Sequence, residues 1–153
     1  MTTDAEHRSD PFQLDRFVSA QEPIYAEALR EIQAGEKETH WMWFVFPQVA
    51  GLGRSSTAQH YAIGSIDEAR AYLAHPVLGP RLRECAATVL QVQGQSALDI
   101  FGDLDEVKLR ASMTLFAMVT ERDTVFREVL DRYFGGEPDP MTLQFLERDG
   151  AGE

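Results

Sequence analysis

The sequence predicts an all-α protein, a compact single domain of about eight or nine short helices spanning residues 10–147. Helix-capping patterns recur along the chain, apolar residues repeat at helical spacing between them, and β-hairpin patterns are absent. The chain has 153 residues, 44% of them hydrophobic, which is the length of one domain and enough apolar material for a core. We expect residues 1–9 and 148–153 to form flexible tails.

Two helices are expected before residue 36. The first begins at Asp10-Pro11, because aspartate is a favoured N-cap and proline suits the first helical position. Pro23 separates it from a second helix, which Gly35 ends as a C′ glycine. The apolar stripe of the second helix consists of Ile24, Tyr25, Ala28, Leu29 and Ile32.

The segment 39–47 is the most aromatic part of the chain. Its aromatic residues are Trp41, Trp43, Phe44 and Phe46. A buried strand and a short buried helix both fit an apolar run of this length. We favour a helix capped by Thr39 and stopped before Pro47, because no other segment offers a convincing strand partner. A one-turn helix opened by Ser56 is expected to follow.

Capping signals define the helices of the second half. Ser65 and Glu68 have the spacing of a capping box, which opens a helix that runs to residue 74. Pro76 opens the next helix, which continues up to Gly94. The later helices are expected to start at Ser96, Asp103, Asp123 or Thr124, and Asp139-Pro140, with ends at Gly102 and Gly135-Gly136. The residues expected to share one core are Trp41, Phe44, Phe46, Met113, Phe116, Val129 and Phe134.

Charge and composition exclude several classes of partner. The net charge is −11, from 25 acidic and 14 basic residues, so we expect neither nucleic acid nor an anionic membrane surface as a partner. There is no apolar leader and no run of roughly 18 apolar residues, which predicts a cytoplasmic protein. No metal-ligand spacing is recognisable, and Gly51-Leu52-Gly53 lacks the third glycine of a dinucleotide site, so neither metal nor cofactor is expected. Whether the protein is an enzyme, and its oligomeric state, stay open.

The segment 51–56 is the best candidate for a binding loop. Its glycines let the backbone approach a ligand, Arg54 offers a planar cationic fork, and Ser55 offers a hydroxyl. A phosphate or carboxylate suits this set of donors. The alternative is an ordinary surface loop whose serine caps a helix.

A second polar group interrupts the apolar run 104–119. Lys108 and Ser112 share one face of the expected helix, with Arg110 between them. They are either a solvated face paired with Asp105 and nearby acids, or one wall of an anion-accepting cleft. The full hypothesis is a cleft lined by Arg54, Ser55, Lys108, Arg110 and Ser112, walled by Trp41 or Trp43, with His40 or His60 at its edge.

Several of these segments resemble a bacterial domain-of-unknown-function family, number 1810. The resemblance is carried by His-Trp-Met-Trp-Phe-Val-Phe-Pro-Gln at 40–48, Gly-Leu-Gly-Arg-Ser at 51–55, and the segments 68–82, 108–116 and 133–136. It covers roughly residues 10–146 and implies a mostly helical single domain without assigned catalytic residues. The family is sometimes labelled calpastatin-like, which implies a disordered inhibitor of proteases. This aromatic-rich composition excludes that interpretation.

Two alternatives to a small-ligand protein follow. One is a protein–protein interaction module that uses an exposed aromatic surface. The other comes from a looser similarity of His60-Tyr61, Glu68-Ala69 and 108–116 to a helical family acting on ADP-ribose-like or riboside nucleotides. That similarity implies N-glycosidase chemistry, although Gln59 stands where the family's motif has an acid.

Overall fold

Helices provide the regular structure of this protein. A computed structural model describes residues 10–151. It contains α2 (Asp15–Gln21), α3 (Tyr25–Gln33), α4 (Met42–Val45), α5 (Ser56–His60), α6 (Ile66–Ala74), α7 (Leu78–Gln91), α8 (Ala97–Val119), α9 (Val125–Phe134) and α10 (Pro140–Ala151). Within these residues β-structure is limited to one isolated parallel bridge between Val49 and Ile63. The predicted all-α class is therefore confirmed.

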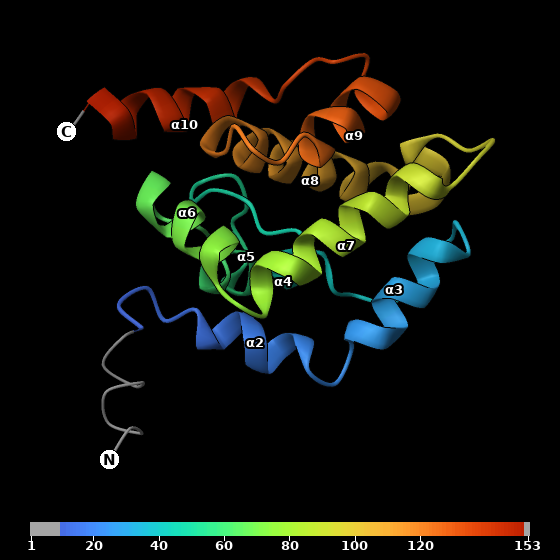
Figure 1. Cartoon of the computed structure of the whole chain (residues 1–153), viewed down its shortest axis with the longest axis horizontal. Coiled ribbons are helices and arrows are strands. Elements are labelled where there is room, and N and C mark those ends of the chain that lie inside the picture. Colours follow the sequence, from blue (N-terminus) through green and yellow to red (C-terminus); the bar gives the residue numbers. More distant parts are fainter. Residues whose placement is uncertain (1–9, 152–153) are drawn as a thin grey trace.

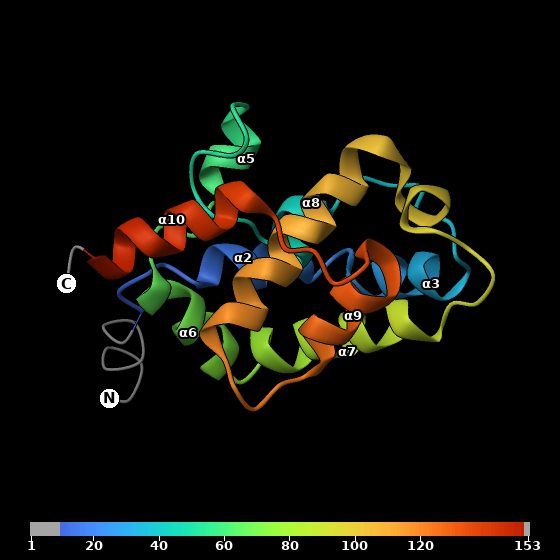
Figure 2. The same ribbon diagram turned by 90° about the horizontal axis from the view of Figure 1, so that it is seen from above.

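The long helix α8 is the centre of the arrangement. It packs against α9, α10, α6 and α4, while α7 packs against α9, α6 and α3 (Figure 1). Helix α2 contacts α4 on the side of the molecule opposite to α10. The short helix α5 stands apart from the other helices, as Figure 2 shows. No helix in the described part of the chain is long and apolar enough to cross a membrane.

The core forms where these helices meet, and most of its predicted members are buried there. Trp41, Phe46, Met113, Phe116 and Val129 are each 0% exposed. Phe44 and Phe134 are only half-buried and pack against the edge of the core. Phe44 instead faces a groove that is described below.

Several predicted helix starts differ from the structure by a few residues. Helix α2 begins at Asp15 rather than at Pro11, because Gln13 has a φ of 55° and interrupts the helix. The Asp10 carboxylate still caps the helix by accepting from the amides of Leu14 and Asp15. The aromatic segment is helical, as predicted, but the N-cap of α4 is Trp41 and not Thr39.

Caps further along the chain are confirmed or shifted. Ser55, not Ser56, caps α5. Ser65 caps α6 as predicted, but the Glu68 carboxylate accepts from the amide of Gly64 and not from that of Ser65. The complete reciprocal box lies at Ser96 in α8.

Helix α7 begins differently from the prediction. It starts at Leu78, and the Nδ1 atom of His75 accepts from the amides of Val77 and Leu78. The His75 side chain thus satisfies two free amides at the start of this helix, whose N-cap residue is Val77 and not Pro76.

Glycines end or break the later helices where the sequence predicts. Gly102 has a φ of 84° and bends α8 between the helices predicted to start at Ser96 and at Asp103. Gly135, with a φ of 63°, ends α9. Asp103, expected to cap the long helix, makes no capping hydrogen bond to any residue between 10 and 151.

The C-terminal end differs from the prediction of a loose tail from residue 148. Helix α10 continues to Ala151, and the carboxylate of Asp149 accepts from the amide of Ile66 at 2.9 Å. This contact fixes α10 against the start of α6. The remaining parts of the predicted tails, residues 1–9 and 152–153, lie outside the described residues.

Candidate functional site

The segment 49–63 leaves the body of the protein and returns to it at one point. Val49 and Ile63 form the parallel bridge at its neck, where Ile63 donates to the Gln48 carbonyl at 2.8 Å and Ala50 donates to the Ile63 carbonyl at 2.9 Å. We call this segment the α5 excursion. A closed neck with a packed loop above it is the geometry of an Ω-loop, a frequent location for functional residues.

Arg16 of α2 clamps the returning end of the α5 excursion. Its guanidinium donates to the carbonyls of His60 at 2.9 Å and Ala62 at 3.0 Å. It also pairs with the carboxylate of Glu68 at 2.8 Å. One side chain therefore joins α2, α5 and α6, which holds α5 in a fixed position beside α4.

Local contacts shape the excursion itself. Ser55 accepts from the Ala58 amide at 3.1 Å, and the Gln59 side chain donates to the Arg54 carbonyl at 3.0 Å. A Cβ at Gly53 would lie 2.5 Å from the Cβ of Ala58, so only glycine fits there without a shift. The glycine predicted to admit a ligand serves instead to pack the loop against α5.

A groove lies between α4 and α5. Its volume is about 560 Å³, and it is lined by His40, Trp43, Phe44, Ser56, Thr57, His60 and Tyr61. The ring of Tyr61 lies 5.3 Å from that of Phe44 and 4.6 Å from that of His60, between centroids. The groove therefore combines aromatic faces with imidazole and hydroxyl groups, the mixture of surfaces typical of small-molecule sites.

Lys108 of α8 lies at the Trp43 side of this groove. Its ammonium nitrogen is 5.6 Å from the centroid of the Trp43 ring and 3.1 Å from the Asp105 carboxylate. Asp105 also pairs with Lys37 at 2.8 Å, and the Lys37 ammonium lies 5.0 Å from the Trp41 ring. Two lysines thus share one carboxylate, which leaves the group with a net positive charge beside the tryptophans.

The two tryptophans, either of which was expected as the wall of the cleft, have different environments. Trp41 is fully buried, and its indole N–H donates to the Glu31 carboxylate at 3.0 Å. Trp43 is half-buried and faces the groove. Trp43 is therefore the candidate wall residue of the site.

Glu31 is a buried carboxylate that the sequence analysis missed. It is 1% exposed and accepts hydrogen bonds from Glu38, Thr39 and Trp41. Burial alone favours the neutral acid, but the hydrogen bonds from Thr39 and Glu38 outweigh it, and the pKa of Glu31 falls to about 2. The sequence places Glu31 next to Ile32 in the amphipathic helix α3, and this position was the signal that could have indicated its burial.

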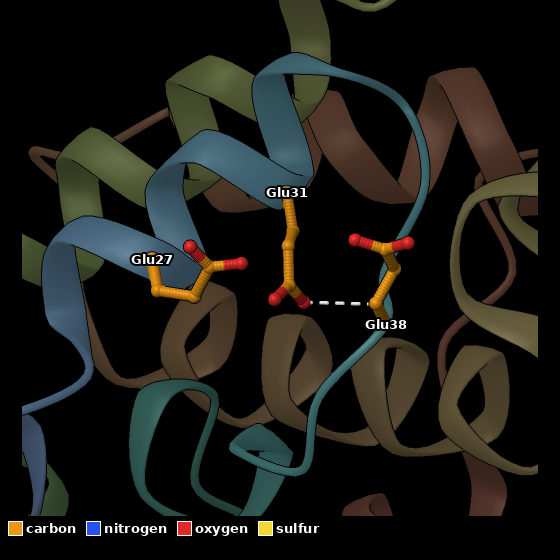
Figure 3. Close-up of side chains that lie close together, drawn as sticks. All are labelled: Glu27, Glu31 and Glu38. Carbon is orange, nitrogen blue, oxygen red and sulfur yellow. Dashed lines mark hydrogen bonds between the residues drawn. The ribbon is translucent and has the colours of Figure 1, made fainter.

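Glu31 lies between Glu27 and Glu38, and the three carboxylates approach within 4.8 Å of one another (Figure 3). Arg30 pairs with Glu27 and lies 3.7 Å from the carboxylate of Glu38. The oxygens of Glu31 are already occupied by backbone and side-chain donors. This cluster thus has a structural explanation, and we assign no metal to it.

The structure places the predicted site residues in three environments. It brings His40, Trp43 and His60 together in the groove, with Lys108 against Trp43. Arg54 and Ser55 belong to the α5 excursion, but they are not among the lining residues of the groove.

Arg110 and Ser112, the other two members of the predicted cleft, do not line the groove. Arg110 donates to the carbonyls of Glu137 at 2.9 Å and Pro138 at 3.2 Å, which joins α8 to the α9–α10 connection. Ser112 is 0% exposed, and its hydroxyl has no hydrogen-bond partner among residues 10–151.

Four further residues complete the groove, namely Phe44, Ser56, Thr57 and Tyr61. Phe44 was expected in the core, Ser56 and Thr57 were noted only as hydroxyls at the candidate loop and the start of the expected one-turn helix, and Tyr61 was noted only in the looser similarity at His60-Tyr61. Their common position depends on the closure of the excursion at Val49 and Ile63, a contact that no local pattern predicts.

Comparison with known proteins identifies the family. Residues 11–146 match the family described as "Protein of unknown function (DUF1810)". The chain belongs to this family. The fold is also similar to the crystal structure of the conserved hypothetical protein Rv1873 from Mycobacterium tuberculosis, with 52% sequence identity and a TM-score of 0.89 over 90% of this chain and 99% of that one. No curated protein matches the chain.

Proposed function

We propose that the groove between α4 and α5 binds a small ligand that has both a planar ring and an anionic group. The observation that carries this proposal is the convergence of Trp43, Phe44, Tyr61 and two histidines on one groove beside a fixed excursion. Aromatic faces stack on planar rings, while imidazole and hydroxyl groups donate to phosphate or carboxylate oxygens.

The charges around the groove support an anionic ligand. Lys108 and Lys37 together exceed the charge of Asp105, and the residues that line the groove include no carboxylate. A region of positive charge is unusual in a chain whose net charge is −11. Arg54, on the same excursion and without an ion pair to any residue between 10 and 151, is the proposed second cation.

The same features favour a small-ligand site over the two alternatives. The residues that line the groove include no carboxylate to serve as the acid of glycosidase chemistry. The large apolar side chains that the structure exposes are aliphatic or methionine, namely Leu98, Leu104, Val107, Met118 and Met141. An interaction surface made of exposed aromatic rings therefore has no support among residues 10–151.

A thermal-shift comparison tests the proposal. Adenosine monophosphate, uridine monophosphate and flavin mononucleotide carry both a planar ring and a phosphate, whereas adenosine and ribose 5-phosphate each carry one of these parts. We expect at least one complete ligand to raise the melting temperature more than either part, because binding to the folded state stabilises it.

Two variants connect that shift to the site. Arg54→Ala should reduce the ligand-dependent shift, because it removes the proposed second cation, and should leave the stability of the free protein within about 0.5 kcal/mol, as for a surface change. Arg148→Ala removes an exposed arginine of α10 and should leave the shift intact. The proposal fails if none of the complete ligands produces a shift, or if both variants lose it equally.

A further inference from the structure

A second region of positive charge lies around the connection between α8 and α9. Arg70 on α6 and Arg122 in this connection are exposed, and neither forms an ion pair with any residue between 10 and 151. In a chain with 25 acidic and 14 basic residues, unpaired arginines that lie together are unexpected. Both line the same hollow in the surface.

This hollow is small and has one charged and one apolar side. Its volume is about 200 Å³, and it is lined by Arg70, Leu73, Ala74, Arg83, Val119, Thr120, Arg122 and Asp123. Three arginines face one carboxylate, so the lining carries a net charge of +2 (three positive charges and one negative). We call this feature the arginine hollow.

Hydrogen bonds connect several residues that line the arginine hollow. Arg83 of α7 holds Asp123 with two hydrogen bonds, from Nε at 2.8 Å and Nη2 at 3.0 Å. Thr120 donates to Asp123 at 3.4 Å and accepts from the Arg122 amide at 3.3 Å. These bonds fix the backbone that carries Arg122. A fixed frame lowers the entropy cost of holding a ligand between flexible arginines.

Close packing of α7 against α6 brings the other side of the hollow into place. A Cβ at Gly79 would lie 2.2 Å from the Leu73 carbonyl and 2.8 Å from Nη1 of Arg83. Glycine at this position therefore lets the end of α6 approach α7. As a result, Arg70 of α6 borders the same hollow as Arg83 and Arg122.

We propose that the arginine hollow binds a phosphoryl oxyanion between Arg70 and Arg122. Guanidinium groups bind phosphate oxygens through paired, charge-assisted hydrogen bonds, and Arg83 is already committed to Asp123. The site is separate from the groove, because α5 and the α8–α9 connection lie on opposite sides of the molecule (Figure 2). The phosphoryl group belongs either to free phosphate or to a phosphate monoester.

Nuclear magnetic resonance of the arginine side chains tests this site directly. Inorganic phosphate and glycerol phosphate are titrated into the full chain at constant ionic strength, with chloride as the reference anion. Saturable shifts of the Arg70 and Arg122 Nε–H signals are expected, and tighter binding of glycerol phosphate than of phosphate would identify a monoester as the source. Failure of either anion to produce a saturable shift overturns the proposal.

Matched substitutions distinguish a specific phosphate site from a general attraction of phosphate to positively charged side chains. Arg70→Gln and Arg122→Gln should each weaken phosphate binding about tenfold or more, because each removes a charge-assisted pair. Arg148→Gln removes an equally exposed arginine that does not line the hollow, and its affinity should equal that of the wild type. Equal losses in all three variants would also overturn the proposal. The readout does not involve Trp43, so failure here leaves the groove proposal untouched.

Discussion

At the scale of single residues, the most consequential side chain is Glu31. Its carboxylate holds the amides of Glu38 and Thr39 and the indole of Trp41. These bonds fix the backbone that enters α4, and α4 carries Trp43 into the groove. A buried charge of this kind is stabilising only while every donor around it stays in place.

The low pKa of Glu31 makes a prediction for acid stability. The folded-state pKa is about 2 against an ordinary value of 4.5, so the ionised carboxylate stabilises the fold above about pH 4.5. That contribution is lost as the pH falls from about 4.5 to about 2. Urea unfolding across this range should show the loss, and Glu31→Gln should lower stability near neutral pH by about 2 kcal/mol.

The same urea unfolding measurements on variants provide the control for this prediction. Glu31→Gln should lose less stability on acidification than the wild type, whereas Glu22→Gln, which alters an exposed pair with Arg81 outside this cluster, should keep the wild-type slope. An unchanged slope in Glu31→Gln would contradict the assignment.

Two hydroxyls of α8 make a matched test of buried polar groups. Thr114 donates to the Arg110 carbonyl at 2.8 Å and accepts from the Asp139 amide at 2.9 Å, whereas Ser112 has no partner among residues 10–151. Both are fully buried. Unfolding measurements should therefore find Thr114→Val destabilising by about 1–3 kcal/mol and Ser112→Ala neutral or stabilising. A marked loss in Ser112→Ala would indicate a partner for its hydroxyl.

At the scale of helices, the sequence predicts which elements exist better than where each begins. Glycines at positive φ and the serine and aspartate caps give the number and order of helices, because these residues satisfy end groups locally. The predicted start of α2 was wrong because Gln13 adopts a positive φ, which is uncommon for a residue of this type. At α5 the cap is Ser55 instead of the predicted Ser56, because neighbouring serines are equivalent as caps.

The position of α5 should depend on Arg16. Arg16→Gln removes the donors to His60 and Ala62, so the neck of the excursion should open more often. Amide hydrogen exchange of Ala50 and Ile63, which donate across the neck, should become about 5- to 30-fold faster. Arg132→Gln is the matched control, because Arg132 holds the carbonyls of Leu90 and Val92 on another part of the fold. Unchanged exchange at the neck in Arg16→Gln would show that the clamp has no effect.

At the scale of the whole molecule, the site depends on contacts between distant segments. Trp43 and Lys108 meet because α4 packs against α8, and the histidines meet because the excursion closes at its neck. Residue types drew attention to segments that border the groove, but they did not indicate that Arg110 would be committed to carbonyls or that Ser112 would be buried. Only the tertiary arrangement determines which of several polar residues face one groove.

The distribution of charge also belongs to this scale. The protein is strongly acidic, yet Lys108 adjoins the groove on one side and unpaired arginines line a hollow on the other. Two cationic regions on opposite sides favour small anions over an extended polyanion, because the net charge of the whole protein is −11.

Fluorescence of the two tryptophans tests the central claim, that the groove is a ligand site, most directly. Trp43 faces the groove, while Trp41 is buried behind it and acts as an internal reference. Titration with adenosine monophosphate, uridine monophosphate and flavin mononucleotide should give a saturable change in tryptophan emission for at least one of them. Trp43→Phe should remove that change and keep the emission of Trp41. A titration in which no ligand changes the emission, or in which the change persists in Trp43→Phe, would contradict a ligand site in the groove.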